Sequence, residues 1–429
     1  MIAGISIPYH FHYNINFILM KRPVSPFIAL RFPDFRSMWI GLFISAIGSQ
    51  MQIVGVTWHV YELTHSAFSL GFIGLSRFVP LLLVSPFGGL IADAFDRKKI
   101  IIINQLVMSV SAFLLFVATF TNLVSPLFIY FILAINSVCS SIDIPARHAL
   151  TPHLLPRKYF MNAISLNSLM WQASIVIGPA IAGFAIAYLG VGSLYLVNSL
   201  SYLAVVVSVL LIRFTPELEG KSSTISLSAL KEGFVFVFKH PLISSSMIID
   251  FFATFFSSAT TLLPIFAKDI LNVGPQGLGL LYAASSVGAI FAGLLFSSFP
   301  HVRHQGKILI VSVFIYGITT IFFGLSRLFI FSFVFLALSG ATDMISTVIR
   351  NTLRQLNTPD RLRGRMTSIN SIFYNGGPQL GEVEAGVVAG FFGAPVSVVI
   401  GGIGTIIVTA LIAFFVPKLR KYHGDEVII

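Results

Sequence analysis

The sequence predicts an all-α membrane protein with twelve transmembrane helices in two six-helix halves. The prediction rests on the composition, on the lengths of the apolar runs and on the placement of the basic residues. Of the 429 residues, 56% are hydrophobic and only 10% are charged, whereas ordinary soluble domains carry about 25% charged residues. A water-exposed surface of normal size cannot be built from this composition, so we expect lipid to be the main solvent.

Apolar runs of suitable length follow one another along the whole chain. A helix needs about twenty apolar residues to cross a bilayer. The long runs and the 34 glycines favour packed helices over the short alternating strands of a membrane barrel. The predicted spans are residues 38–62, 69–92, 100–121, 126–149, 160–189, 192–213, 242–267, 277–299, 307–325, 328–352, 366–393 and 395–416.

The basic residues predict the orientation of these spans. Most of the 27 lysines and arginines fall in the segments on the same side as the N-terminus, and loops in the cytoplasm are enriched in such residues. The sequence therefore predicts a multi-pass protein of the bacterial inner membrane with both termini in the cytoplasm. Topology also explains the net charge of +11 without a nucleic-acid partner. The expected partners are a small-molecule substrate and membrane lipids, and we expect a monomer.

The same pattern divides the chain into segments. Pro, His and Arg interrupt the N-terminal segment, which is neither a clean signal peptide nor a span, and Met20 is a second candidate start. Apolar residues at helical spacing between Leu227 and Phe238 predict an amphipathic helix on the inner membrane surface. The predicted segments are a cytoplasmic N-terminal segment (1–37), a first half (38–213), a linker (214–241), a second half (242–416) and a cytoplasmic tail (417–429).

The two halves are related in sequence. An offset of 203 residues superposes a set of Arg, Leu, Pro, Asn, Ser and Gly residues from spans four and five on spans ten and eleven. The pairs are Arg147 and Arg350, Leu150 and Leu353, Pro156 and Pro359, Asn167 and Asn370, Ser168 and Ser371, Gly178 and Gly381, Gly183 and Gly386, and Gly190 and Gly393. Many transporters are built from such repeats around a site at the membrane midplane. The alternative is an old duplication with only a structural meaning.

The loop between spans two and three carries a recognisable motif. Gly89, Asp93 and the basic run Arg97-Lys98-Lys99 resemble the signature loop of the major facilitator superfamily, although Asp96 stands where that family usually has Gly. The resemblance implies that Asp93 and Arg97 stabilise one state of a cytoplasmic gate, to which Gly89 and Lys98 also belong. The competing interpretation is a topology determinant, because three basic residues would also hold the loop inside.

Span five contains a Gly-Pro pair followed by small residues. The run from Gly178 and Pro179 to Gly183 is similar to the antiporter motif of the same superfamily. A helix with these residues bends and lies close to its partner. The motif favours antiport, and a pure packing device would have the same sequence.

Ionisable residues inside spans are costly, so each one is a functional candidate. Asp143 and Arg147 lie four residues apart, and Asp343 and Arg350 lie seven apart, so each pair shares one helix face. We expect both pairs to belong to an inner-gate ion network. The alternative is that the arginines extend to water at the membrane surface.

Deeper in the spans lie Arg77, Asp250, Glu382 and Glu384. Asp250 and one of the two glutamates are the candidate proton carriers, because a carboxylate in a low dielectric can exchange protons near neutral pH. Glu382 and Glu384 point to nearly opposite sides of a helix, so only one should face a central cavity. Arg77 suits an anionic substrate or neutralises one of these carboxylates. The Gly and Pro residues at 376–381 predict a kinked or broken helix.

Polar and aromatic residues in other spans are candidates for contact with the substrate. The alternative is that they make ordinary contacts between helices. The candidates are Gln52, Asn136, Asn167 and Trp171, together with Arg77.

Three further stretches resemble the branch of the superfamily that contains the enterobactin exporter and macrolide effluxers. They are residues 32–36, 143–147 and 376–382. The resemblance implies export of a siderophore or another small amphiphilic molecule, driven by the proton gradient. Uptake of such a solute is an alternative, and a non-transporting receptor or scaffold is another, which the buried charges disfavour.

Other classes of function find no support in the sequence. No glycine-rich nucleotide loop with Lys and Ser or Thr is present, nor is a nucleophile with a base. The single Cys139 excludes a disulfide framework, and His301 and His304 come closest to ligand spacing among scattered histidines. We therefore predict no enzyme, no metal site and no cofactor.

Overall fold

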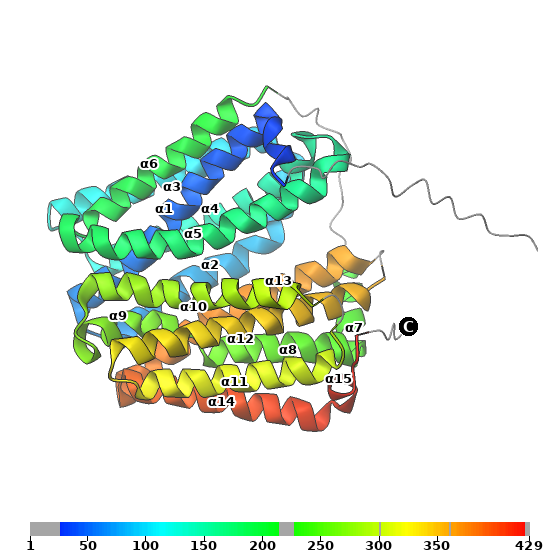
Figure 1. The fold of residues 1–429 in the computed structure, drawn as a ribbon. Helices are drawn as coiled ribbons and strands as arrows, with labels where there is room; N and C mark the ends of the chain where they lie inside the picture. The colour runs from blue at the N-terminus through cyan, green and yellow to red at the C-terminus, as the bar shows by residue number, and fades with distance from the viewer. Residues whose placement is uncertain (1–25, 214–226, 300–301, 360–361, 425–429) are drawn as a thin grey trace, which may run out of the picture.

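The computed structural model describes residues 26–213, 227–299, 302–359 and 362–424, and within them every regular element is a helix. The predicted all-α class is therefore confirmed for this part of the chain. The long helices run in alternating directions and lie roughly parallel (Figure 1). They are α1 (Pro33–Thr64), α2 (Ala67–Ala94), α3 (Arg97–Phe120), α4 (Pro126–Leu150), α5 (Phe160–Leu189), α6 (Gly192–Leu210), α8 (Pro241–Phe256), α10 (Gly274–Ser297), α11 (Gln305–Leu325), α12 (Phe329–Leu356), α13 (Arg363–Phe392) and α14 (Ala394–Phe415).

Eleven of the described helical segments are long and apolar enough to cross a membrane. The predicted span 366–393 forms α13, which is not among them. Its Asn, Gly and Pro residues and its two glutamates make it less apolar than the other long helices. On this criterion the structure supports one span fewer than the sequence predicted.

The interruption of a span lies elsewhere than predicted. The sequence predicted a kinked or broken helix at 376–381, and the break is wrong, because α13 continues from Arg363 to Phe392. Its glycines serve close packing instead: a Cβ on Gly377 would lie 3.0 Å from the Phe251 carbonyl oxygen of α8. Span seven is the interrupted one, since α8 ends at Phe256 and is followed by the short helices Ala259–Leu262, α9 (Leu263–Ile265) and a π-helical turn, Phe266–Ile270.

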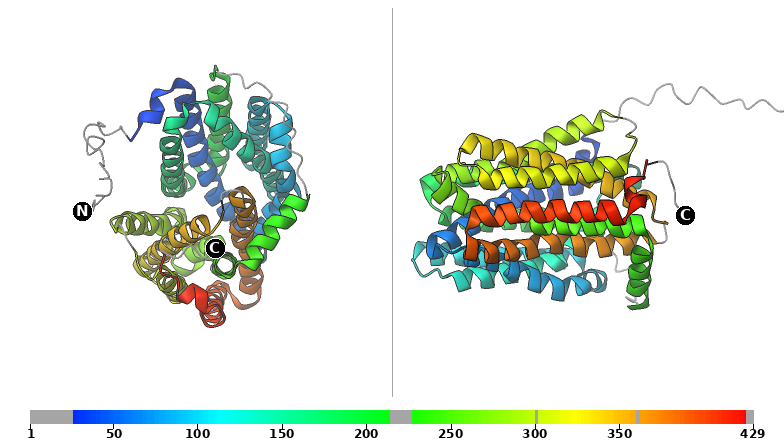
Figure 2. Two further views of the ribbon diagram at one scale, coloured as in Figure 1. Left: turned by 90° about the vertical axis from the view of Figure 1, so that its right-hand side faces the viewer. Right: turned by 90° about the horizontal axis from the view of Figure 1, so that it is seen from below.

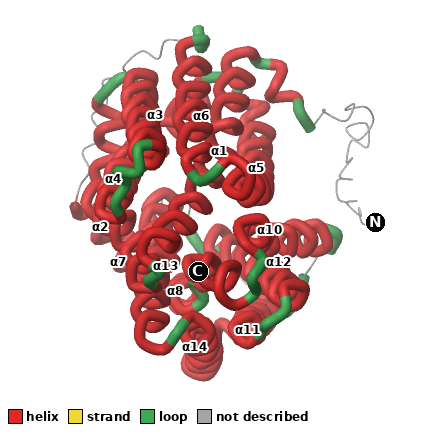
Figure 3. The backbone as a smooth tube through the Cα atoms, turned by 90° about the vertical axis from the view of Figure 1, so that its left-hand side faces the viewer, coloured by secondary structure: helices red, strands yellow, loops and turns green. Residues whose placement is uncertain are grey.

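The long helices form two groups. Helices α1–α6 pack with one another, and α8 and α10–α14 form the second group, as the views along the helices show (Figures 2 and 3). Two pairs of helices connect the groups, α2 with α13 and α5 with α10.

We call the end of the bundle where α1, α3, α8 and α13 begin the basic end, and the opposite one the far end. Arg97, Lys98 and Arg213 lie at the basic end, together with Arg363 and Lys418. Helix α7 (Leu227–Lys239) lies across the other helices there (Figure 2), in the segment where the sequence predicts an amphipathic helix. In Figure 1 the two groups meet at the far end and diverge towards the basic end.

The sequence repeat has a counterpart in the structure. Adding 203 to the bounds of α5 (Phe160–Leu189) gives those of α13, and the same offset relates the starts of α4 and α12. Gly190 and Gly393 cap α5 and α13 with φ values of 78° and 86°, a backbone region that residues with a Cβ rarely adopt. The duplicated glycines therefore end equivalent helices in the same conformation.

The contacts between the two groups depend on glycine. A Cβ on Gly183 of α5 would lie 3.0 Å from the Gly279 Cα of α10, and one on Gly71 of α2 would lie 3.1 Å from the Gly386 Cα of α13. Helices with side chains at these positions could not approach so closely. Gly183 and Gly386 are also partners in the sequence repeat.

We predict that Gly386→Val lowers stability by about 1–3 kcal/mol, because overpacking a close contact forces backbone shifts. The matched control is Gly89→Val, because a Cβ at Gly89 meets no described atom within 4 Å. Thermal unfolding of the purified variants in detergent measures the difference. Equal melting temperatures for the two variants would contradict the close contact between α2 and α13.

Candidate functional site

One ion pair joins the two groups of helices within the bundle. Arg77 Nη2 of α2 donates to Glu382 Oε2 of α13 at 2.6 Å, and the two side chains are 23% and 15% exposed. The Arg77 Nε is buried without a hydrogen-bond partner among the described residues. Arg77 therefore keeps a donor available beside Glu382.

The packing of α13 shows which way the two glutamates point. Gly381 lies against Phe255 of α8, and Gly386 lies against Gly71 of α2. Successive helical residues are about 100° apart, so Glu382 lies between these two faces and points to the inside of the bundle. Glu384 lies outside that arc and has no ion-pair partner among the described residues. The structure thus separates the two candidates, as their spacing predicts.

A second group of charges lies between α8 and α12. Asp250 pairs with Arg350 Nη2 at 2.9 Å and with Arg354 Nη2 at 3.0 Å, and all three side chains are at most 4% exposed. Arg354 also donates through Nη2 to the Ser246 backbone carbonyl at 2.7 Å. The two guanidinium groups thus share one buried carboxylate. Asp250 therefore has the surroundings of a structural counter-ion.

Asp343 belongs to the same group of charges but is less enclosed. It accepts from Arg350 Nη2 at 3.4 Å, and its side chain is 43% exposed. Arg350 is thus closer to Asp250 than to the partner that the sequence suggested.

In the first group of helices, Asp143 and Arg147 form an ion pair along α4. Gln105 Nε2 of α3 donates a hydrogen bond to Asp143 Oδ2 at 3.2 Å. Asp143 is buried, with 2% of its side chain exposed. The ion pair lies within α4, and the hydrogen bond from Gln105 connects it to α3.

The loop before α3 connects helices at the basic end. Asp96, which replaces the usual Gly of the motif, caps α3 by accepting from the backbone N–H of Lys98 at 2.9 Å. Arg97 donates to the Ala149 carbonyl of α4 at 3.2 Å, and Lys98 Nζ donates to the Ile212 carbonyl at 2.6 Å. The side chain of Asp93 lies outside the described part of the structure.

Glycine lets two helices approach closely, so Gly89 of the loop motif is a candidate contact position. A Cβ on Gly89 meets no described atom within 4 Å, whereas one on Gly88 would lie 3.1 Å from the Ser141 backbone carbonyl carbon of α4. The expectation for Gly89 as a contact position is therefore wrong in this conformation, because Gly88 is the residue on the face of α2 that touches α4.

The Gly-Pro motif of span five lies at contacts between helices. A Cβ on Gly178 would lie 3.0 Å from the Ile47 carbonyl of α1. Five residues on, Gly183 meets Gly279 of α10, close to the Pro179 carbonyl. The motif thus packs one face of α5 against α1 of its own group and another face against α10 of the other group.

The substrate-contact candidates differ in their surroundings. Gln52 accepts from Asn198 at 2.6 Å and Asn136 accepts from Ser111 at 2.8 Å, so both make contacts between helices of the first group. Trp171 is 50% exposed on α5, two helical turns before Gly178 and on the same face. Asn167 lies one turn further, partly buried.

The sequence analysis missed the contacts that join the groups at the far end. Lys268 pairs with Glu62, and the Tyr61 hydroxyl donates to Asp269. The ammonium group of Lys268 also lies 5.8 Å from the Trp58 ring centroid. About 200 residues separate these partners, and the only signal in the sequence was the presence of charges at the ends of two spans.

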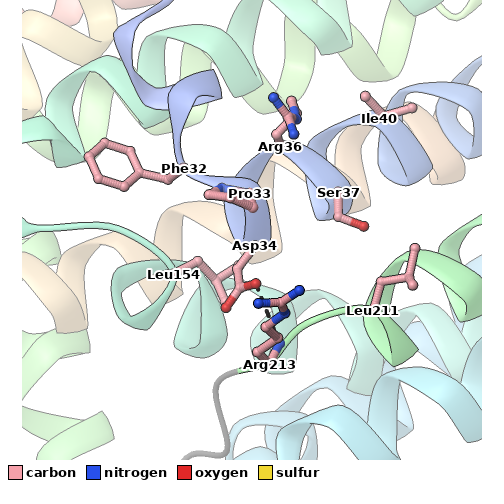
Figure 4. Close-up of a pocket in the computed structure, with 9 residues that line it drawn as sticks. All are labelled: Phe32, Pro33, Asp34, Arg36, Ser37, Ile40, Leu154, Leu211 and Arg213. Atoms are coloured by element: carbon pink, nitrogen blue, oxygen red, sulfur yellow. Dashed lines mark hydrogen bonds between the residues drawn. The ribbon is translucent and has the colours of Figure 1, made fainter.

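A cavity of about 610 Å³ lies at the basic end, away from the ion pair between the groups. It lies where α1 begins and α6 ends, and Asp34, Arg36 and Arg213 line it (Figure 4). The backbone N–H of Arg213 donates to Asp34 at 3.4 Å. Among the described residues, no three His, Cys, Asp or Glu side chains gather as they do around a transition-metal ion.

Two packed groups of membrane helices with charges between them define a multi-pass membrane transporter. The profile of the family described as transmembrane secretion effector matches residues 24–427. The chain belongs to this family of the major facilitator superfamily, whose members are transporters and not enzymes.

Relatives and solved structures agree with the family. The enterobactin exporter EntS of Shigella boydii serotype 18 is 26% identical over 400 residues, which cover 91% of this chain and 94% of that protein. The EntS of Escherichia coli O1:K1 has the same identity and coverage. The expected resemblance to the enterobactin exporter branch is thus confirmed.

Two solved structures share the fold. The nucleoside transporter NupG has a TM-score of 0.70 at 13% identity, covering 91% of this chain and 99% of its own. A bacterial homologue of the human lysosomal transporter Spinster, inward-facing and occupied, has a TM-score of 0.70 at 14% identity, covering 94% and 99%.

We predict that Asp250→Asn destabilises the protein by about 3–5 kcal/mol, because it leaves two buried arginines with an uncompensated charge. Asp343→Asn, the matched control in the same group of charges, should cost about 1 kcal/mol or less, because that side chain is partly exposed and weakly paired. Thermal unfolding in detergent compares them. A larger loss for Asp343→Asn would contradict the assignment of Asp250 as the main counter-ion.

Proposed function

We propose that the protein exports a siderophore or another small amphiphilic molecule across the bacterial inner membrane, using the proton gradient and alternating access. The observation that carries this proposal is the Arg77–Glu382 ion pair between the two groups of helices. A charge pair inside a membrane protein is costly and marks a functional path. The relatives named enterobactin exporters support the choice of direction and cargo.

The proposal includes the topology. Helix α13 would cross the membrane as well and bring the number of spans to twelve, because it is 30 residues long and packs between α2 and α8. The basic end would face the cytoplasm, with both termini there. The two halves would then be residues 38–213 and 242–416, joined by the linker 214–241, in a monomeric transporter. The segments 1–25 and 214–226 lie outside the described residues.

The conformation supports entry of cargo from the cytoplasm. At the far end, Glu62 with Lys268 and Tyr61 with Asp269 join the two groups. The groups diverge towards the basic end (Figure 1). In alternating access the far-end contacts would break when the halves rock about the glycine contacts between α2 and α13 and between α5 and α10.

Glu382 is the carboxylate that we assign to proton coupling. Protonation of Glu382 would remove its charge and release Arg77, so the proton and the ion pair would compete for one group. The released guanidinium could then bind an anionic group of the cargo. Asp250 is held by two arginines and Glu384 points away from the inside, so both are weaker candidates.

The remaining charges would control the cytoplasmic gate. Arg97 and Lys98 bind carbonyl groups at the ends of α4 and α6, and Asp143 with Arg147 connects α4 to α3. In the second half, Arg350 is the residue equivalent to Arg147 in the sequence repeat and would have the corresponding role. Asp93 keeps its proposed role in this gate from the resemblance of the loop to the family motif.

Two aromatic side chains at equivalent positions of the repeat would contact the cargo. Trp171 of α5 and Tyr374 of α13 are 203 residues apart and are 50% and 57% exposed. Each lies seven residues before a glycine that packs against the first helix of its own group, Gly178 or Gly381. Both lie in the part of α5 and α13 that is nearer the basic end, where the groups diverge, so their exposed rings would be accessible to the cargo, and Asn167 would lie beside Trp171.

We predict that Glu382→Gln abolishes export driven by a pH gradient, because the amide cannot release a proton. The assay uses purified protein in liposomes with an imposed pH gradient and compares enterobactin with a generic efflux dye. Glu384→Gln is the matched control on the same helix and should keep most of the activity.

The direction and the coupling are read in the same assay. Movement of the compound that is insensitive to the gradient in all proteins would refute proton coupling. Uptake in place of export would support the importer alternative. Absence of movement for every compound would favour a receptor or scaffold.

We predict that Trp171→Ala and Tyr374→Ala each raise the KM for the transported compound about 3- to 10-fold, as expected for the loss of one aromatic contact. Tyr188→Ala is the control, since Tyr188 is 78% exposed and lies at the far end of α5. A KM that changes equally in all three variants would argue against these two residues as contacts.

A further inference from the structure

The second group of helices encloses a polar cavity of its own. Its volume is about 160 Å³, and it lies among α8, α10, α11 and α12, apart from the space between the two groups. A water molecule needs about 10–15 Å³ of such volume, so the cavity can hold several waters or one hydrated ion. Eight oxygen-bearing side chains line it: Ser257, Thr260, Ser285, Tyr316, Thr319, Thr320, Ser339 and Asp343.

Three of these hydroxyl groups can only accept further hydrogen bonds, because each already donates its hydrogen to a backbone carbonyl. The hydroxyls of Thr319 and Thr320 both donate to the Tyr316 backbone carbonyl at 2.9 Å, and that of Ser339 donates to the Leu336 carbonyl at 2.9 Å. A hydroxyl that has given its hydrogen to a carbonyl presents only lone pairs on its other side. The cavity therefore offers an environment rich in acceptors.

Asp343 adds a negative charge to this wall. Its Oδ1 accepts from Arg350 at 3.4 Å, and Oδ2 has no hydrogen-bond partner among the described residues. Arg350 has its closer carboxylate partner in Asp250, at 2.9 Å. A carboxylate with a free oxygen beside several neutral acceptors is a set of ligands for a hard cation, and its single charge suits a monovalent one.

We propose that this cavity binds a monovalent alkali cation through Asp343 and the hydroxyl oxygens of α11 and α12. The cation would take the position towards which Arg350 now reaches, and Arg350 would then pair with Asp250 alone. The site goes beyond the proposed exporter and does not depend on it, because binding is measured without transport.

The test is thermal unfolding and calorimetric titration of the full chain in detergent with NaCl and KCl, each against choline chloride at the same ionic strength. We expect Na⁺ or K⁺ to raise the melting temperature of the wild-type protein with a saturable dependence, since a ligand that binds only the folded state stabilises it. Asp343→Asn should weaken the binding about tenfold or more, because it removes the charged ligand.

Two threonines of the second group provide the matched comparison. Thr320→Val removes a cavity oxygen while keeping the shape of the side chain, and we expect the affinity to fall about 3- to 10-fold. Thr342→Val removes a hydroxyl that donates to the Leu338 carbonyl and does not line the cavity, so its affinity should equal that of the wild type.

Two results would overturn the proposal. One is that neither Na⁺ nor K⁺ acts differently from choline on the wild-type protein. The other is that Asp343→Asn, shown to be folded by its unfolding curve, keeps the wild-type affinity. Loss of substrate export with retained cation binding would refute the proposed function alone.

Discussion

Backbone-to-backbone packing at glycine is the constraint on which the arrangement of this protein depends. The groups of helices meet where Gly183 faces Gly279 and where Gly71 faces Gly386. At such contacts small residues let dispersion forces act over a long interface, which is how helices associate in lipid. The second contact also positions the charge pair, because Glu382 is one turn from Gly386 and packs beside Gly74. Glycine packing therefore sets the distance over which Arg77 can reach Glu382.

The helices related by the repeat and the interactions within one helix could be predicted from the sequence. The offset of 203 residues identified equivalent helices, and the spacing of Asp143 and Arg147 indicated a pair within one helix. Partners far apart in the chain could not be predicted, because helical periodicity gives the face of a residue and not the helix opposite. Neutralisation of a deep carboxylate was one of the two roles predicted for Arg77, but the sequence could not identify Glu382, 305 residues away, as the partner. The far-end pairs were not predicted. The glycines near Pro378 misled for the same reason: close packing against α8 and a helix break need the same residues.

Asp143, Asp250, Asp343 and Glu382 differ chiefly in what balances their charge. Asp250 has two arginines within 3.0 Å, so neutralising it would leave two cations uncompensated. Asp143 has an arginine and an amide, which together with its burial make it a fixed part of α3–α4 packing. Glu382 of the second half pairs with one arginine, Arg77 of the first half. Asp343 pairs only weakly with Arg350, which lies closer to Asp250. Charge that can change without loss of the fold is therefore confined to Glu382 and Asp343.

These two carboxylates are connected through a continuous path of contacts. Asp343 shares Arg350 with Asp250, which lies on α8. At the end of α8, Ser258 donates to the Pro378 carbonyl of α13 at 3.1 Å, one turn from Glu382. Contact alone does not transmit a signal; coupling requires an element with two arrangements that both sites bias. The interrupted span after Phe256 would have to be that element, because it is the break in the helices that connect the two carboxylates. A cation at Asp343 and a proton at Glu382 would then act on the same junction from opposite sides, and the occupancy of one site would change the affinity of the other.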